Sequence, residues 1–304
     1  MKKVVKDRRA ALKRKETITC YLVLLFPIIG FLIFTLYPML WAGRISFFSY
    51  DGLHTNFIGS SNYKSIFKDT NFWASWGNNL KVMIIKTPVE ALLAFVTANV
   101  LMDRTKFSGI FRAIYYLPGI ISTAIVALVF SNMFQYFGVF NTYLMKWGII
   151  EKNIDWLSST NTAFIMVFIV TLWMSFGGSV LYYQAALSTV PKELIESARL
   201  DGANAFAVTF KVKLPLILPT LQVLMLLSLN GCLHLGEIVL LLTGGSPGGK
   251  SYTISAYLMS RIVPGMGDKA DVGYAAAMSI VVSIICCLCA LAFNKLTKKL
   301  KSIY

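Results

Sequence analysis

The chain has 304 residues, of which 56% are hydrophobic and only 14% are charged, and its mean hydropathy is +0.65. Soluble proteins carry about 25% charged residues, so this composition excludes an ordinary soluble domain and indicates a membrane protein. A formal net charge of +15 is compatible with nucleic-acid binding, but the basic residues gather at both ends of the chain beside apolar segments, as cytoplasmic flanks of membrane spans do.

Six apolar segments set the expected architecture. Each is long enough to cross about 30 Å of hydrocarbon as a helix of about 20 residues, and a helix satisfies its own backbone hydrogen bonds in lipid. The sequence therefore predicts an all-α, polytopic membrane protein with about six transmembrane helices. The membrane domain covers residues 18–293, between a basic N-terminus (1–17) and a basic tail (294–304). The six segments are residues 18–42, 79–102, 113–134, 162–187, 214–240 and 274–293.

The distribution of Lys and Arg orients these segments. An even number of spans puts both termini on one side, and that side then holds 19 Lys and Arg residues against eight on the other. Because cytoplasmic loops carry the excess of positive charge, we predict that both termini are cytoplasmic. A basic start followed by an apolar run is similar to a secretory signal. Residues 18–42 are too long for a signal core and lack a small-residue cleavage site, so we interpret them as a retained anchor.

Three ionisable residues lie inside the second segment. Lys81 is near its outer end, where a long side chain can reach the interface. Lys86 and Glu90 are four residues apart, so they are placed to pair on one helix face. Ionisable residues within a span are functional candidates by default, but a pair that merely faces neighbouring helices accounts for them equally well. The sequence leaves both roles open.

Small residues and cysteines give further local expectations. Pro118 and Gly119 are expected to loosen the third helix, and Gly177 and Gly178 permit close approach of a neighbouring helix to the fourth. All five cysteines lie in apolar segments, and the two histidines are not at ligand spacing. The sequence therefore indicates neither a metal site nor a disulfide framework.

A charged stretch joins the fourth and fifth segments and reads PKELIESARLDGANAFAVTFKVKLPLILPTL. Its first proline suits the start of a helix, where acidic side chains are favoured by the helix dipole. Val190, Leu194 and Ala198 repeat every four residues, so this helix is amphipathic. Gly202 offers the left-handed conformation that ends it, and a second short helix follows. The stretch predicts two short helices joined by a glycine elbow at the membrane surface.

The spacing within this stretch resembles the EAA loop of bacterial ABC importer permeases. The acidic residue, the two small residues, the glycine and the later Leu-Pro pair fall at the family's intervals, and the residues on each side of the glycine resemble the sugar-importing branch. Serine replaces one usual alanine, a small-for-small change. Strings such as YYLP, LTGG and GYAAA also resemble sugar permeases. The elbow residues that carry the resemblance are Glu196, Ser197, Ala198, Asp201, Gly202 and Ala203.

The resemblance implies a function and a set of partners. In that family the loop, residues 188–213 here, is the coupling helix that docks on a cytoplasmic ATPase, so the six elbow residues are expected to couple ATP hydrolysis to alternating access. The resemblance also implies a separate ATPase dimer that binds ATP and Mg²⁺, a second and different permease subunit, an external solute-binding protein and a carbohydrate substrate. The chain itself is expected to be no enzyme and to hold no cofactor or metal.

The resemblance also suggests where substrate passes. Residues midway along the two helices that flank the coupling loop can line the pathway in sugar permeases. The matching positions here are Trp173, Ser175, Ser228 and Asn230. An indole can stack on a sugar face, and the other three can hydrogen-bond hydroxyls. Each can equally be a packing residue, since polar and small side chains also hold spans together.

One string favours a different function. Gly244, Gly249, Lys250 and Ser251 satisfy the phosphate-loop pattern, which would make the chain a nucleotide hydrolase. The charge distribution places this string outside, away from cytoplasmic ATP, so we expect a plain turn. The alternative function left open is an ion-coupled secondary transporter or channel, for which the ionisable pair of the second segment supplies the only serious candidates.

Overall fold

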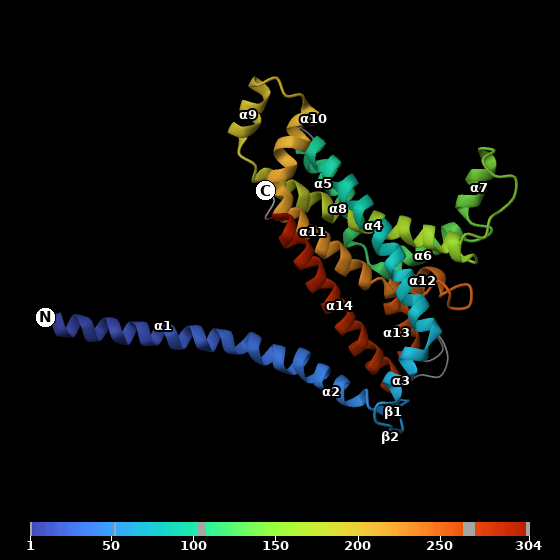
Figure 1. The fold of residues 1–304 in the computed structure, drawn as a ribbon, viewed down its shortest axis with the longest axis horizontal. Helices are drawn as coiled ribbons and strands as arrows, with labels where there is room; N and C mark the ends of the chain where they lie inside the picture. Colours follow the sequence, from blue (N-terminus) through green and yellow to red (C-terminus); the bar gives the residue numbers. More distant parts are fainter. Residues whose placement is uncertain (1, 52, 103–107, 264–270, 302–304) are drawn as a thin grey trace. The chain divides into compact units, whose positions relative to one another are not determined.

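The computed structural model describes residues 2–51, 53–102, 108–263 and 271–301. Most of these residues are helical (Figure 1), which confirms the expected all-α class. The chain divides into two compact units, residues 1–67 with 269–283, and residues 68–268 with 284–304. Three basic residues of the charge count, Arg104, Lys106 and Lys269, lie outside the described residues.

The first unit starts with one continuous helical segment formed by α1 (Lys2–Phe31), the π-helical turn η1 (Leu32–Leu36) and α2 (Tyr37–Ile45). Its part from Arg14 to Ile45 is apolar enough to cross a membrane and contains the expected first span. Most apolar side chains of this part are exposed, as those of a helix that faces lipid or a partner are.

A small antiparallel hairpin follows α2. Strands β1 (Phe48–Tyr50) and β2 (Thr55–Phe57) pair with Phe48 opposite Phe57, and α3 (Ser61–Lys68) comes next. The Asn62 amide donates to the carbonyl oxygens of Ser46 and Phe48, both at 2.9 Å, which ties α3 to the hairpin. A Cβ on Gly273, at the start of α14 (Val272–Lys301), would lie 2.0 Å from the Phe48 carbonyl oxygen, so only glycine fits there.

The second unit is a helical bundle. Its long helices are α4, α8 and α11, and α4 and α5 both pack along α8. Shorter helices close the two ends of the bundle (Figure 1). The elements are α4 (Thr70–Met102), α5 (Ser108–Ile120), α6 (Thr123–Phe134), α7 (Val139–Lys146), α8 (Thr160–Ser188), α9 (Lys192–Leu200), α10 (Ala205–Ala207), η2 (Val208–Lys213), α11 (Leu214–Leu233), α12 (Gly236–Thr243) and α13 (Ile254–Ile262).

Within the described residues, five helices are long and apolar enough to span a membrane, and a sixth span is obtained if α5 and α6 are taken together. The expected third span is wrong as a single rod, because α5 and α6 meet at 90°. The break follows Pro118 and Gly119, the two residues expected to loosen this helix. The expected fifth span is also too long. Its helix ends at Leu233, and the apolar run continues into the separate helix α12.

Close helix packing explains one of the two adjacent glycines in α8. A Cβ on Gly177 would lie 1.9 Å from the Tyr115 carbonyl oxygen, so the backbones of α5 and α8 meet where this residue has no side chain. A Cβ on Gly178 would meet nothing within 4 Å. The close approach expected at both glycines is therefore confirmed for Gly177 and wrong for Gly178.

Candidate functional site

The elbow between α8 and α11 has the geometry that its sequence predicts. Helix α9 ends at Leu200, and Gly202 adopts the left-handed conformation with φ +83°. The Ala203 N–H donates to the Ala198 carbonyl at 2.9 Å, and the Gly202 N–H donates to the Arg199 carbonyl at 3.0 Å. These two bonds form a Schellman motif, which satisfies carbonyls at the helix end. The start differs by one residue, since the proline expected to open the helix caps it instead.

Asn204 starts the second short helix of the elbow. Its side-chain oxygen accepts a hydrogen bond from the Ala207 N–H at 2.8 Å, which is the N-cap arrangement. Helix α10 then passes through the π-helical segment η2 into α11 without a break. Two short helices joined by a glycine elbow are therefore confirmed.

The elbow presents both polar and apolar side chains to its surroundings. Glu196, Ser197, Asp201 and Gly202 are exposed, and Ala198 and Ala203 are partly buried. Apolar side chains beside them are also exposed, Leu200 by 89% and Phe206 by 70%. Such exposure of large apolar groups next to charges is typical of a surface that contacts another protein. Ile195, on the other side of α9, packs against the buried cluster formed by α4, α8 and α11.

A buried lysine joins the elbow to the bundle. Lys213, at the end of η2, donates from Nζ to the Asn99 side-chain oxygen of α4 at 2.8 Å. Asn99 in turn donates to the Thr209 hydroxyl at 3.1 Å. In the sequence, Lys213 is one of the basic residues on the cytoplasmic side and stands just before the Leu-Pro pair of the stretch that resembles the EAA loop. The structure gives its side chain a specific partner on another helix.

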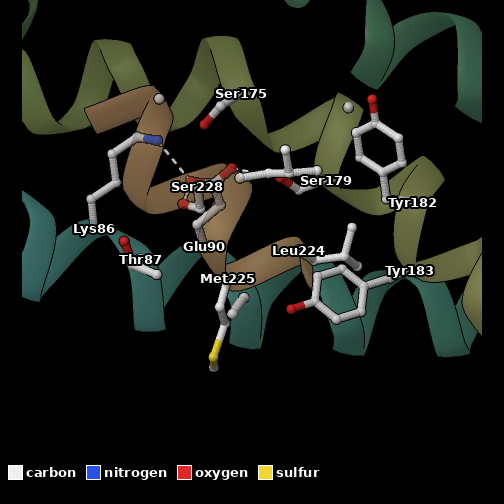
Figure 2. A pocket seen from close by; sticks show the side chains of 14 residues that line it. Lys86, Thr87, Glu90, Ser175, Ser179, Tyr182, Tyr183, Leu224, Met225 and Ser228 are labelled. Carbon is white, nitrogen blue, oxygen red and sulfur yellow. Dashed lines mark hydrogen bonds and ion pairs between the residues drawn. The ribbon is translucent and has the colours of Figure 1, made fainter. Parts of the chain in front are cut away.

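A cavity of about 210 Å³ lies between α4, α8 and α11, and both apolar and polar side chains line it. Figure 2 shows polar side chains from all three helices converging on it. Its polar lining consists of Lys86, Thr87, Glu90, Ser175, Ser179, Tyr182, Tyr183 and Ser228.

Glu90 is the centre of the cavity's hydrogen-bond network. Lys86 Nζ lies 2.7 Å from Glu90 Oε2, and the two side chains are 5% and 4% exposed. The Ser179 hydroxyl donates to Glu90 Oε1 at 2.5 Å, and the Ser228 hydroxyl donates to Glu90 Oε2 at 3.0 Å. One carboxylate therefore links α4 to both α8 and α11, the two helices that carry the elbow.

The structure separates the four expected pathway residues. Ser175 and Ser228 line the cavity. Trp173 does not; its ring packs edge-on against Phe130 with 5.4 Å between centroids, and it is 42% exposed. Asn230 lines a different cavity of about 120 Å³, with α4 and α14. Two residues of helix change the direction of a side chain by about 200°, which explains why Trp173 turns away from Ser175.

Sequence reasoning did not identify four polar residues of the cavity lining, Thr87, Ser179, Tyr182 and Tyr183, although α8 contains a usable signal. Ser175, Ser179 and Tyr182 follow one another at intervals of four and three residues, which places them on one face of the helix. Gly178 lies on the same face and also lines the cavity. This spacing identifies the face of α8 but not the partner it faces on α4.

The glycine-rich string after α12 is a turn. A phosphate loop follows a strand, whereas this string follows the helix α12 and comes two residues before α13. Four of its glycines have positive φ angles. The Asn78 amide of α4 donates to the carbonyls of Lys250 at 2.7 Å and Tyr252 at 3.0 Å, so the turn is fixed to the bundle. It lies at the end of the bundle opposite α9 (Figure 1).

The family model for binding-protein-dependent transport system inner membrane components matches residues 91–302. The chain belongs to this family. The match covers the elbow and the α8 and α11 walls of the cavity, together with most of the chain. The resemblance to sugar-type ABC importer permeases seen in the sequence is confirmed.

The chain is similar over most of its length to curated permeases. It is 27% identical to the lactose transport system permease protein LacF of Rhizobium radiobacter, over 90% of this chain and 94% of that protein. It is 30% identical to the arabinooligosaccharides transport system permease protein AraP of Bacillus subtilis (strain 168), over 90% of this chain and 87% of that protein.

A solved structure has the same fold. The bacterial ABC transporter involved in the import of the acidic polysaccharide alginate matches with a TM-score of 0.82 and 24% identity, over 96% of this chain and 99% of that chain. The chain is therefore a polytopic ABC transporter permease, an inner-membrane component with several apolar helices. Its family is one of transport subunits and not of enzymes.

Proposed function

We propose that the chain is the membrane-spanning permease subunit of an ATP-driven, binding-protein-dependent importer of carbohydrate. The observation that carries this function is the elbow. A rigid turn fixed by Gly202 exposes Glu196 and Ser197 between the two helices whose other segments wall the cavity. A partner that pushes on the elbow acts on both of these helices at once.

The route from the elbow to the cavity is short. Lys213 holds η2 to Asn99 of α4, and Glu90 lies nine residues earlier on that helix, about 14 Å away. Glu90 then contacts α8 and α11 through Ser179 and Ser228. Movement of the elbow thus has a continuous chain of contacts to the cavity walls. Alternating access follows if the bundle has two stable arrangements and ATP in the partner subunits favours one of them.

The partners follow from what the chain contains and from its relatives. ATP and Mg²⁺ bind to a separate cytoplasmic ATPase dimer, which docks on the six elbow residues. A second, different permease completes the pathway, and a solute-binding protein delivers the substrate from outside. A solved relative supports the last partner, because the bacterial alginate ABC transporter has been determined in complex with an alginate pentasaccharide-bound periplasmic protein.

The proposed orientation puts the elbow and both termini in the cytoplasm. Residues 1–17 and 294–304 are then basic cytoplasmic flanks of a membrane domain formed by residues 18–293, with the coupling loop at 188–213. Two observations support it. Positive charge is concentrated on that side, and the glycine-rich turn lies at the opposite end of the bundle from α9.

Carbohydrate is the substrate class that the cavity and the relatives support together. Ser175 and Ser228 contribute hydroxyls to the cavity, and tyrosine rings line it as well. Hydroxyl, charged and aromatic groups in one cavity suit a ligand that has both hydroxyls and apolar C–H faces. Trp173 and Asn230 have no contact with this cavity, so we assign them no part in it.

The test replaces two elbow residues in the complete importer. We expect Glu196→Lys and Gly202→Val to abolish ATP-driven sugar uptake in reconstituted vesicles while membrane insertion stays normal, since both residues are exposed. Glu151→Lys is the matched control, because it makes the same charge change at an exposed residue far from the elbow in sequence. Normal uptake in both elbow variants would contradict the proposal. Uptake that needs a proton or sodium gradient and no ATP would favour the ion-coupled alternative.

A further inference from the structure

The cavity contains polar groups that the protein itself leaves without partners. An ammonium group has three N–H donors. Within the described residues, the Lys86 ammonium makes one hydrogen bond, to Glu90. The Thr87 hydroxyl, on the same helix, is buried and makes no hydrogen bond to nitrogen or oxygen in that part of the chain; the thiol of Cys232, a weak donor, lies beside it. Buried donors without acceptors are costly, so these groups favour a ligand rich in oxygen atoms.

The charges of the cavity cancel. Among the described residues that line it there is one cation, Lys86, and one anion, Glu90, with 2.7 Å between Nζ and Oε2. A carboxylate on the ligand that approached Lys86 would also approach Glu90, and like charges repel strongly where water is scarce. A cationic ligand would meet the same problem at Lys86. An uncharged polyol meets neither, because its hydroxyl oxygens accept from Lys86 and Thr87 while its O–H groups donate to Glu90.

The volume of the cavity and its apolar lining limit the size and the shape of the ligand. Its volume of about 210 Å³ is below the ~300–1,000 Å³ of pockets that hold drug-sized molecules, which suits one sugar ring at a time. Tyr182, Tyr183 and Leu224 contribute apolar surface against which a ring can lie by its C–H face. Figure 2 shows the two tyrosines on one side of the charged pair.

We propose that Lys86, Thr87 and Glu90 form the hydroxyl-binding group of a site for one uncharged sugar unit, and that the paired charges exclude uronates. This inference rests on the proposed function and narrows it from carbohydrate to neutral carbohydrate. The substrate expected here is uncharged, unlike alginate, the acidic polysaccharide named for the structural relative. A shared fold therefore does not require a shared substrate charge.

The test measures the charge of the cavity without requiring its sugar. Ser175→Cys places a thiol in the cavity, in a complete importer whose five native cysteines are replaced by alanine. The thiol is labelled with two methanethiosulfonate reagents of similar size, the anionic sulfonatoethyl and the cationic trimethylammonioethyl compounds. Each rate is divided by the rate with a free small thiol. We expect the two normalised rates to agree within about threefold, because the two charges cancel.

Variants of the pair then show whether these charges face the ligand space. Glu90→Gln leaves the cation unbalanced and is expected to favour the anionic reagent by about tenfold, and Lys86→Met is expected to favour the cationic reagent by a similar factor. The double exchange Lys86→Glu with Glu90→Lys keeps the balance and should restore the native ratio. Lys81→Met is the matched control: it removes a cation from the same helix, beside a different cavity, and should leave the ratio unchanged.

Several outcomes would overturn the inference. A tenfold preference of the native cavity for the anionic reagent would indicate a cationic site suited to uronates. Equal ratios in the native chain, Glu90→Gln and Lys86→Met would show that the pair does not face the ligand. No labelling, at rest or during ATP turnover, would show that nothing of sugar size enters. If a single variant fails to assemble, the ratio of the two labelling rates in the native cavity still tests whether its charges cancel. An importer that takes up no carbohydrate would defeat the proposed function instead, since the labelling ratio does not depend on transport.

Discussion

The elbow and the cavity are both polar, but their geometry has different origins. The backbone hydrogen bonds that form the turn of the elbow are local, and the bond that spans the most residues joins Ala203 to Ala198. The bonds of Glu90 to Ser179 and Ser228 join residues 89 and 138 positions apart. The residues around the turn are therefore sufficient to form the elbow, whereas the cavity forms only when three helices have packed together. Substitutions in the elbow should change what the chain contacts, and substitutions in the cavity should change its stability.

The largest expected effect on stability comes from removing one member of the buried ion pair. Lys86→Met leaves the Glu90 carboxylate buried without its cation, and breaking a buried pair in this way costs about 3–5 kcal/mol. We expect the free energy of unfolding, measured by SDS titration in mixed micelles, to fall by that amount.

Two variants check the cause of that loss. Lys81→Met removes a different cation from the same helix. The amine of Lys81 lies 6.0 Å from the Phe164 ring centroid, and this substitution should lower the free energy of unfolding far less. Replacing Lys86 and Glu90 together by methionine should recover most of the stability, because exchanging a complete buried pair for apolar residues is often close to neutral. Equal losses of unfolding free energy in all three variants would contradict the idea that a paired buried charge matters more than an isolated one.

The second effect concerns the contact between α5 and α8 beside the cavity. Gly177→Ala puts a methyl group 1.9 Å from the Tyr115 carbonyl oxygen, so the helices must move apart, at a cost of about 1–3 kcal/mol for an overpacked site. Gly178→Ala is the adjacent control. Its methyl group meets no atom within 4 Å, and alanine favours helix by up to about 1 kcal/mol. Thermal unfolding of the two variants in detergent should therefore shift in opposite directions; shifts of equal size and sign would contradict this packing.

The elbow could be predicted apart from a shift of one residue at its start, because its signals are local. Gly202 supplies a left-handed conformation, and its neighbours supply the helix that ends there and the cap at Asn204 that begins the next one. These features need no information about distant parts of the chain. The family resemblance also rests on this stretch, which is why fold and class could be predicted together.

The cavity and two span boundaries could not be predicted in this way. The spacing of Lys86 and Glu90 predicts a pair, but not that Ser179 and Ser228 complete it, because this depends on how α8 and α11 are rotated. Hydropathy continues past Leu233, so the apolar run does not report where α11 ends. Pro118 indicates a weak point, whereas the 90° angle between α5 and α6 depends on what each helix packs against. Long-range packing decides each of these features.

The smallest expected effect on stability concerns the tip of the hairpin, which is also held by hydrogen bonds between residues close in sequence. The carboxylate of Asp51 accepts from the backbone N–H groups of His54 at 2.7 Å and Leu53 at 2.8 Å. These bonds lower the pKa of Asp51 from 3.8 to about 2, since they favour its ionised form. With a lowered pKa, the stabilisation of the turn is complete above the ordinary value and is lost as the pH falls through about 2. The carboxyl ¹³C shift of Asp51 and the amide shifts of Leu53 and His54 should therefore follow one titration near pH 2, absent in Asp51→Asn. A midpoint near 3.8 would mean that the turn does not hold the carboxylate.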